Sequence, residues 1–119
     1  MRILVVDDSI TMRRIIVNNL KSAGFTDVVQ AANGVEALSQ MNGVELVLTD
    51  WNMPVMDGLT LVKEIRASAA FGNVPIVMIT TEGAREEVLE ALRSGVNDYI
   101  VKPFPKQVLI EKVQSMSRG

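Results

Sequence analysis

The sequence contains no cysteine and no histidine. Without them the chain can form no disulfide, no Cys/His zinc site, no thiol nucleophile, no triad with an imidazole base and no haem held by Cys or His. Any bound metal must therefore be held by oxygen atoms, which favours Mg²⁺, Mn²⁺ or Ca²⁺. Acid–base chemistry falls to carboxylates, lysines or the single tyrosine.

Excess positive charge and long apolar runs are absent too. The chain has 12 Lys and Arg against 14 Asp and Glu, whereas proteins that grip nucleic acid through phosphates usually carry a basic excess. No apolar run approaches the roughly 18 residues that span a bilayer. The apolar stretch near the N-terminus is too short for a signal peptide. We therefore expect a cytoplasmic protein that binds neither nucleic acid nor membrane.

Short β-branched runs alternate with segments of helical period along the 119 residues. The expected strands are 3–6, 27–31, 46–49, 75–79 and 99–101, and apolar residues recur at helical spacing in 12–23, 34–41, 59–65, 88–92 and 105–116. Gly24 and Gly95 are expected to end the first and fourth helices. Five β–α units predict an α/β fold: a doubly wound, five-stranded parallel sheet with five helices on its two faces.

Polar residues follow four of the predicted strands, at the edge where open parallel sheets bind ligands. They are Asp7, Asp8, Asp50, Thr80, Thr81 and Lys102. Each has an ordinary structural explanation when taken alone. The Asp pair and the threonines could cap helices, Asp50 could be a turn residue, and Lys102 could be a solvated strand end.

Together these residues are harder to explain as caps and turns. Three neighbouring carboxylates repel one another, and a divalent cation would relieve that repulsion. A cation, a lysine, a threonine and a carboxylate form a site suited to a phosphoryl group. With no His or Cys in the chain, the candidate nucleophile is the central carboxylate, Asp50.

Four motifs, in order along essentially the whole chain, resemble response-regulator receiver domains, and in particular the single-domain chemotaxis regulators among them. They are Val5-Val6-Asp7-Asp8, Thr49-Asp50-Trp51-Asn52-Met53-Pro54 with Asp57-Gly58, Ile79-Thr80-Thr81-Glu82, and Tyr99-Ile100-Val101-Lys102-Pro103-Phe104. The resemblance implies the flavodoxin-like strand order 2-1-3-4-5. It also implies one receiver domain over residues 1–119 with no output domain.

The resemblance also implies roles for the polar residues at the strand ends. Asp50 resembles the aspartate that accepts a phosphoryl group from a histidine kinase. Asp8, Asp50 and the main-chain carbonyl of Asn52 resemble direct Mg²⁺ ligands, for which Mn²⁺ can substitute, and Asp7 resembles the acid that reaches the ion through water. Lys102 resembles the lysine that pairs with Asp50 and then with a phosphoryl oxygen.

Further residues resemble a switch and a partner surface. Thr80 matches the switch hydroxyl, and Tyr99 the aromatic that turns inward once that hydroxyl moves. The Lys102-Pro103 bond resembles the family's cis peptide. Asn52 and Glu82 match positions that tune loss of the phosphoryl group. The partner face corresponds to Arg85, Val88, Leu92, Tyr99, Val101, Phe104 and Lys112.

The implied partners are a chemotaxis histidine kinase of the CheA type, a flagellar motor switch protein and a phosphatase. The resemblance also implies a monomer that assists its own phosphorylation and dephosphorylation. It implies a signalling protein and not a turnover enzyme. Two departures from the family pattern are a very short leader before the first strand and a slightly compressed stretch from Gly34 to Asp50, so the second helix is expected to be short.

Three alternatives share parts of this pattern. A flavodoxin-type FMN module needs main-chain donors in a phosphate loop after strand one, but that loop opens with Asp7-Asp8, and only 4% of residues are aromatic. A small metal-dependent phosphohydrolase would use Asp50 on external substrates, although 119 residues leave little room for a cap. An adaptor that is never phosphorylated would not need the acids, Thr80 and Lys102 together.

Overall fold

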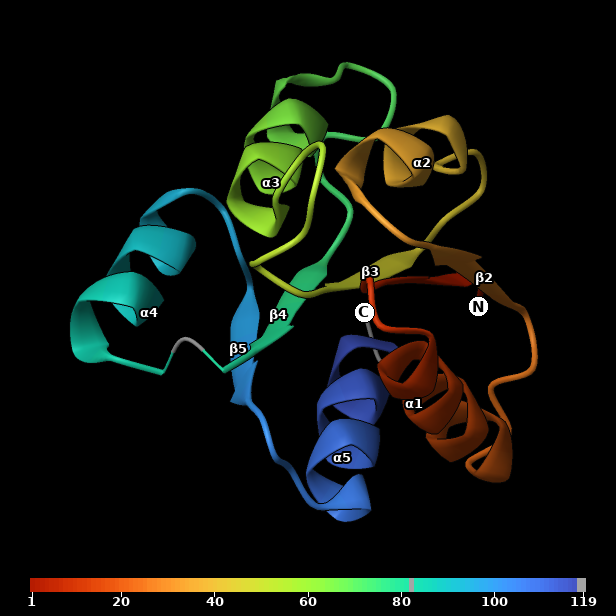
Figure 1. Ribbon diagram of the computed structural model, residues 1–119. Coiled ribbons are helices and arrows are strands. Elements are labelled where there is room, and N and C mark those ends of the chain that lie inside the picture. The colour runs from red at the N-terminus through yellow and green to blue at the C-terminus, as the bar shows by residue number, and fades with distance from the viewer. Residues whose placement is uncertain (82, 118–119) are drawn as a thin grey trace.

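Five parallel strands form the centre of the computed structural model, which describes residues 1–81 and 83–117 (Figure 1). Their order is β2-β1-β3-β4-β5, which confirms the order that the resemblance implied. The strands are β1 (Ile3–Val6), β2 (Val28–Ala31), β3 (Leu46–Thr49), β4 (Ile76–Thr80) and β5 (Asp98–Val101).

Helices cover both faces of this sheet, as the alternating pattern predicts. They are α1 (Ile10–Ser22), α2 (Gly34–Ser39), α3 (Gly58–Ala67), α4 (Arg85–Arg93) and α5 (Lys106–Ser117). Figure 1 shows α1 and α5 on one face of the sheet and α2, α3 and α4 on the other. Within the described residues, none of the helices has the length and apolar character needed to cross a membrane.

The two faces of β1 enter two separate apolar clusters. Leu4 and Val6 pack with residues of α2, α3 and α4, while Ile3 and Val5 pack with residues of α1 and α5. Every residue of β1, β3 and β4 is buried, as expected for central strands of a parallel sheet. Their carboxyl ends are therefore held at fixed positions relative to one another.

The boundaries differ from the sequence prediction at a few places. Helix α2 ends at Ser39, two residues before the predicted end, and Met41 is buried beyond it. Pro75 precedes β4 instead of beginning it, and β5 begins one residue earlier than expected, at Asp98. The second helix is short, in keeping with the compressed sequence there. The predicted cis bond between Lys102 and Pro103 is present.

Both predicted glycine stops are confirmed. Gly24 and Gly95 adopt positive φ angles of 93° and 112°, a region in which side chains are strained. Around Gly95 the Arg66 guanidinium donates to the carbonyl oxygens of Gly72 (2.9 Å), Val74 (2.6 Å) and Gly95 (2.7 and 3.0 Å). It also donates to Oδ1 of Asn97 (2.8 Å). Arg66 of α3 thus ties down the turn between α4 and β5.

The residues at the starts of α1 and α4 show that the polar residues at the strand ends are not helix caps. Ser9, not the Asp pair, is the N-cap of α1, and its hydroxyl accepts from the backbone N–H of Met12 (3.1 Å). The N-cap of α4 is Ala84, and within the described residues no side chain caps this helix. Thr80 and Thr81 lie before that position, so they are not its caps.

Candidate functional site

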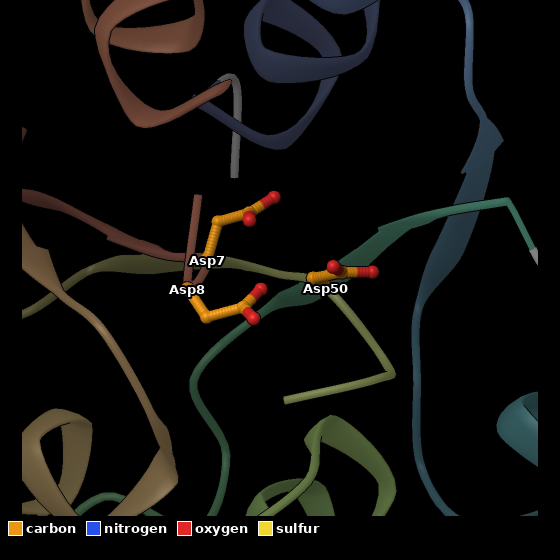
Figure 2. Close-up of side chains that lie close together, drawn as sticks. All are labelled: Asp7, Asp8 and Asp50. Carbon is orange, nitrogen blue, oxygen red and sulfur yellow. The ribbon is translucent and has the colours of Figure 1, made fainter. Parts of the chain in front are cut away.

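Three carboxylates meet where β1 and β3 end. Val6 and Thr49 are paired in the sheet, so the residues that follow them leave the same edge side by side. One carboxylate oxygen each from Asp7, Asp8 and Asp50 can be chosen so that all three lie within 4.8 Å of one another (Figure 2). The predicted convergence of these acids is confirmed, and the cluster could hold a metal ion.

Asp7 is the most buried of the three acids, with 2% of its surface exposed. Its backbone N–H donates to the carbonyl of Ala31 (3.1 Å) at the end of β2. Its Oδ1 accepts from the N–H of Ser9 (2.9 Å), and its Oδ2 accepts from Nζ of Lys102 (2.8 Å). A buried charge is tolerated when it is paired and hydrogen-bonded, and Asp7 meets both conditions.

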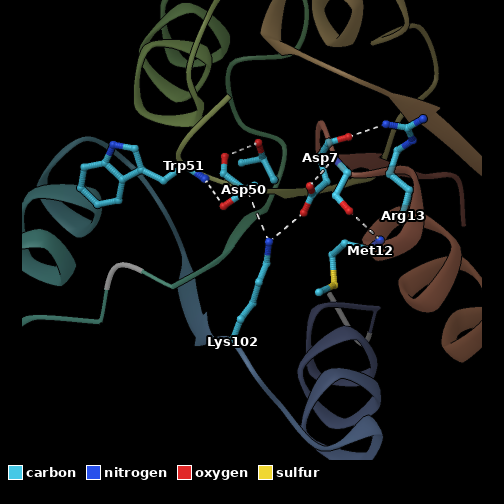
Figure 3. Close-up of polar contacts among 8 residues, drawn as sticks. Asp7, Met12, Arg13, Asp50, Trp51 and Lys102 are labelled. Atoms are coloured by element: carbon cyan, nitrogen blue, oxygen red, sulfur yellow. Dashed lines mark hydrogen bonds and ion pairs between the residues drawn. The ribbon is translucent and has the colours of Figure 1, made fainter. Parts of the chain in front are cut away.

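Lys102 reaches the acids from the end of β5 (Figure 3). Its backbone N–H donates to the carbonyl of Thr80 (2.9 Å), which holds the strand end in place. Its Nζ lies 2.8 Å from Oδ2 of Asp7 and 3.3 Å from Oδ2 of Asp50. Among the described residues this is the one ammonium or guanidinium group paired with the cluster, so the site keeps a negative excess that suits a divalent cation.

The side chain of Asp50 is 12% exposed, and both its backbone and its carboxylate are hydrogen-bonded. Its backbone N–H donates to the carbonyl of Val6 (2.9 Å), and its Oδ1 accepts from the N–H of Trp51 (2.7 Å). Burial raises the pKa of the Asp50 carboxyl, while the charge of Lys102 lowers it, Asp7 raises it further and the Trp51 hydrogen bond offsets part of the rise.

The loop after β3 fits closely around Asp50 because residue 58 is glycine. A Cβ on Gly58 would overlap the carbonyl oxygen of Asp50. The N–H of Gly58 donates to the carbonyl of Trp51 (2.7 Å), and Asp57 caps α3 by accepting from the N–H of Thr60 (2.8 Å). The start of α3 is thereby fixed against the backbone that carries Asp50.

Comparison with known proteins decides the family. A family model described as the response regulator receiver domain matches residues 3–114. The chain belongs to the response regulator receiver family. This membership favours the receiver interpretation over the flavin-binding and phosphohydrolase alternatives.

Individual relatives of this receiver domain are chemotaxis proteins. It is 54% identical to chemotaxis protein CheY1 of Helicobacter pylori over 117 residues, which is 96% of this chain and 94% of that protein. A structure of Vibrio cholerae CheY4 matches with a TM-score of 0.90 at 36% identity and covers 97% of both chains. A CheX–CheY–BeF3–Mg complex from Borrelia burgdorferi matches with a TM-score of 0.91 at 29% identity and covers 98% of this chain and 89% of that one.

The expected switch residues of the receiver lie on β4 and β5, which are neighbours in its sheet. Thr80 is the last residue of β4 and is fully buried, whereas Thr81 is exposed. Tyr99 pairs with Met78 across the two strands, and its hydroxyl oxygen is buried. Asn52 lies exposed in the loop after β3. Glu82, the other residue expected to tune phosphoryl loss, lies outside the described residues.

The receiver's expected partner face follows α4, β5 and α5. Leu92 and Val101 are large apolar side chains with 44% and 45% of their surface exposed. Lys112 of α5 pairs with Asp98 of β5, with Nζ–Oδ2 of 2.9 Å. The remaining members are the exposed Arg85 and the half-buried Val88, Tyr99 and Phe104. Their proposed role in binding stays a prediction.

Sequence reasoning missed Ser9 and Arg13, and it named Gly58 only as part of a motif, without its role at the site. Ser9 caps α1 and fixes Asp7, Gly58 makes room for the Asp50 backbone, and Arg13 donates to the main-chain carbonyl of Asp7 (2.6 Å). A serine directly before an apolar helical pattern is a recognised start signal and could have identified Ser9. Nothing in the local pattern separates Arg13 from the neighbouring Arg14.

Proposed function

We propose that Asp50 accepts a phosphoryl group from a phosphohistidine of a chemotaxis histidine kinase of the CheA type, with Mg²⁺ in the site. Phosphorylation then changes the α4–β5–α5 face so that it binds a downstream target such as a flagellar motor switch protein. The observation that carries this proposal is the meeting of three carboxylates within 4.8 Å beside one lysine ammonium.

The donor set fits Mg²⁺, because it consists of oxygen atoms with a negative excess. Asp8, Asp50 and the main-chain carbonyl of Asn52 would hold the ion directly, and Asp7 would contact it through water. Mn²⁺, which accepts similar ligands, would substitute. When bound, the ion neutralises charge that develops on the transferring phosphoryl oxygens.

The chain's own residues supply the nucleophile and one positive charge. A carboxylate oxygen of Asp50 attacks phosphorus in line, the P–N bond to the kinase histidine breaks, and the imidazole nitrogen keeps the bonding electron pair. The product is an acyl phosphate on Asp50. Lys102, held by Asp7 at 2.8 Å, is close enough to Asp50 to contact a phosphoryl oxygen placed there.

The signal is proposed to pass from Thr80 to Tyr99 because β4 and β5 are paired along their lengths. A swing of a two-state equilibrium from about 1:99 to 99:1 needs roughly 5.5 kcal/mol of differential interaction. One charge-assisted hydrogen bond contributes only about 1.5–3 kcal/mol. Contacts from the phosphoryl group to both Thr80 and Lys102 must therefore act together, or the shift is partial.

The product stays on the chain, so each cycle ends when water removes the phosphoryl group. We assign the tuning of that step to Asn52 and Glu82 and allow for an external phosphatase. On this proposal the protein is a signalling component of the cytoplasm that acts as a monomer, and it is not an enzyme that turns over external substrate.

Incubation with acetyl phosphate and Mg²⁺, followed by intact-mass measurement, tests the central step. The wild-type chain is expected to gain one phosphoryl group, and Asp50→Asn none. Asp57→Asn is the matched control, because Asp57 lies in the same loop but caps α3. Stoichiometric uptake by Asp50→Asn would show that another residue is the acceptor, and no uptake by the wild type would favour the adaptor.

Binding of a motor switch peptide with and without beryllium fluoride tests the output face. Beryllium fluoride should tighten binding to the wild type, and replacing the exposed Val101 by serine should weaken it. Val55→Ser is the control, since Val55 is 81% exposed but lies in the loop between β3 and α3. Equal weakening by the two substitutions would place the partner surface elsewhere.

A further inference from the structure

Arg13 of α1 joins the end of β1 to the edge strand β2. Its Nη1 donates to the main-chain carbonyl of Asp7 (2.6 Å), and its Nε donates to Oε1 of Gln30 (3.3 Å). Its side chain is half-buried. Figure 3 shows the guanidinium directed at the backbone of Asp7, while Lys102 approaches the Asp7 carboxylate.

The ladder between β1 and β2 explains why this carbonyl needs a partner. The N–H of Asp7 donates to Ala31, the last residue of β2. In a regular parallel ladder the Asp7 carbonyl would next accept from residue 33. Asn33, however, is the N-cap of α2, so its backbone has left the ladder. The guanidinium of Arg13 supplies the donor that the strand does not.

Three hydrogen bonds form a closed ring around Asp8. The N–H of Ser9 donates to Oδ1 of Asp7 (2.9 Å), and the N–H of Arg13 donates to the carbonyl of Ser9 (3.0 Å). The guanidinium of Arg13 returns to the carbonyl of Asp7. Asp8 lies between two residues whose backbones are both fixed. Because the peptide group is planar, holding the Asp7 oxygen also orients the N–H of Asp8.

We infer that Arg13 is a positioning residue for the acidic site. By fixing the Asp7–Asp8 peptide it holds the carboxylate of Asp8 where it meets those of Asp7 and Asp50. This inference rests on the proposed function in taking Asp8 as a Mg²⁺ ligand, but the ring of hydrogen bonds does not depend on the ion.

Positioning and simple electrostatics predict opposite effects on Mg²⁺ binding. A cation near the site repels Mg²⁺, so removing the Arg13 charge would tighten binding if charge were its whole contribution. If Arg13 holds Asp8 in place, removing it weakens binding. Loss of a residue that orients a metal ligand typically costs about 10–100-fold in metal affinity. The sign of the change therefore separates the two roles.

The test is a Mg²⁺ titration of Arg13→Gln, Arg13→Lys and Arg14→Gln, followed by the fluorescence of Trp51 and by calorimetry. We expect Arg13→Gln to bind Mg²⁺ at least about 10-fold more weakly. Arg13→Lys should also bind more weakly, because it keeps the charge but loses the two-pronged donor. Arg14→Gln, at the exposed neighbour, should bind as tightly as the wild type or slightly tighter.

Amide hydrogen exchange without Mg²⁺ gives a second readout. Exchange at Ser9 should be faster in both Arg13 variants than in Arg14→Gln, and thermal unfolding identifies variants that are folded at the assay temperature. Mg²⁺ affinity in a folded Arg13 variant equal to that of Arg14→Gln, with unchanged exchange at Ser9, would overturn the inference. Failure of the wild type to bind Mg²⁺ would overturn the proposed function instead, and the exchange data would still decide the role of Arg13.

Discussion

Asp7 and Lys102, 95 positions apart in the sequence, form a 2.8 Å ion pair in which the side chains are 2% and 11% exposed. Lys102 is closer to this buried acid than to Asp50, whose Oδ2 lies 3.3 Å away. The lysine is thus anchored on one acid while it remains within reach of the other. That arrangement keeps a positive charge beside Asp50 without neutralising the whole cluster.

Replacing Lys102 by methionine should strongly destabilise the protein at neutral pH. Removing one member of a buried ion pair typically costs about 3–5 kcal/mol, because the remaining charge is left without a partner. Urea unfolding in Mg²⁺-free buffer measures the change. Lys112→Met is the control, since its pair with Asp98 is about one-third exposed on both sides and should contribute about 0–1 kcal/mol. Equal losses would contradict a special role for burial.

Asp50→Asn should raise the free energy of unfolding at neutral pH in the absence of metal. The pKa of Asp50 is raised in the folded protein, chiefly by burial, so folding favours its protonated form. The contribution of Asp50 to the stability of the wild type therefore falls as pH rises from the ordinary value of 3.8 through the folded pKa, and it stays lower above that window. A neutral asparagine does not suffer this loss.

The gain from Asp50→Asn should therefore shrink as the pH is lowered through that window and vanish below it. Chemical denaturation of both proteins from about pH 3 to pH 7 follows the difference. Asp27→Asn, at a solvent-exposed pair with Arg2, serves as the control for loss of a surface carboxylate. A gain that is independent of pH would show that titration of Asp50 is not its cause.

On the proposed function Mg²⁺ should stabilise the folded chain, because the carboxylate cluster that would hold it exists only when β1 and β3 are paired. At a free concentration 100 times the dissociation constant the gain is about 2.7 kcal/mol, seen as a rise in Tm that a chelator reverses. Asp8→Asn should remove most of this gain, whereas Asp57→Asn should keep it. A Tm of the wild type unaffected by Mg²⁺ would argue against the site.

Gly58→Ala should damage the site through the backbone. The new methyl group meets the carbonyl of Asp50, which cannot move without displacing the acid, and forced overpacking typically costs about 1–3 kcal/mol. Gly34→Ala is the comparison, because the three atoms nearest its methyl are side-chain atoms of Met56 at 2.7–2.9 Å, whereas the methyl of Gly58→Ala overlaps a backbone oxygen. Unfolding and Mg²⁺ titrations should therefore show a larger loss for Gly58→Ala than for Gly34→Ala.

Much of the fold and the grouping of the acids could be predicted from the sequence. Apolar runs such as 46–49 identify buried strands, and β3 has these bounds. Once the strands are parallel, Asp7, Asp8 and Asp50 must leave the same edge, so their convergence follows from topology.

The contacts within the site could not be predicted in the same way. Lys102 contacts Asp7 more closely than Asp50 because of the path of its side chain from β5, which no local pattern records. The hydrogen bond from Arg13 depends on where the ladder of β2 stops. The explanation of Thr80 and Thr81 as caps of α4 was wrong, because that helix begins at Arg85 and its N-cap is Ala84.

The hydrogen bonds of Arg66 limit how α4 can move if, as proposed, a signal reaches it from Thr80. Its guanidinium donates hydrogen bonds to the carbonyl of Gly95, just beyond the carboxyl end of α4, and to the carbonyl of Val74, before β4. At the opposite end of α4, no side chain of the described residues caps the helix at Ala84. We therefore expect a movement of α4 that keeps the Gly95 bonds to pivot about that turn and not to shift the helix along its own axis.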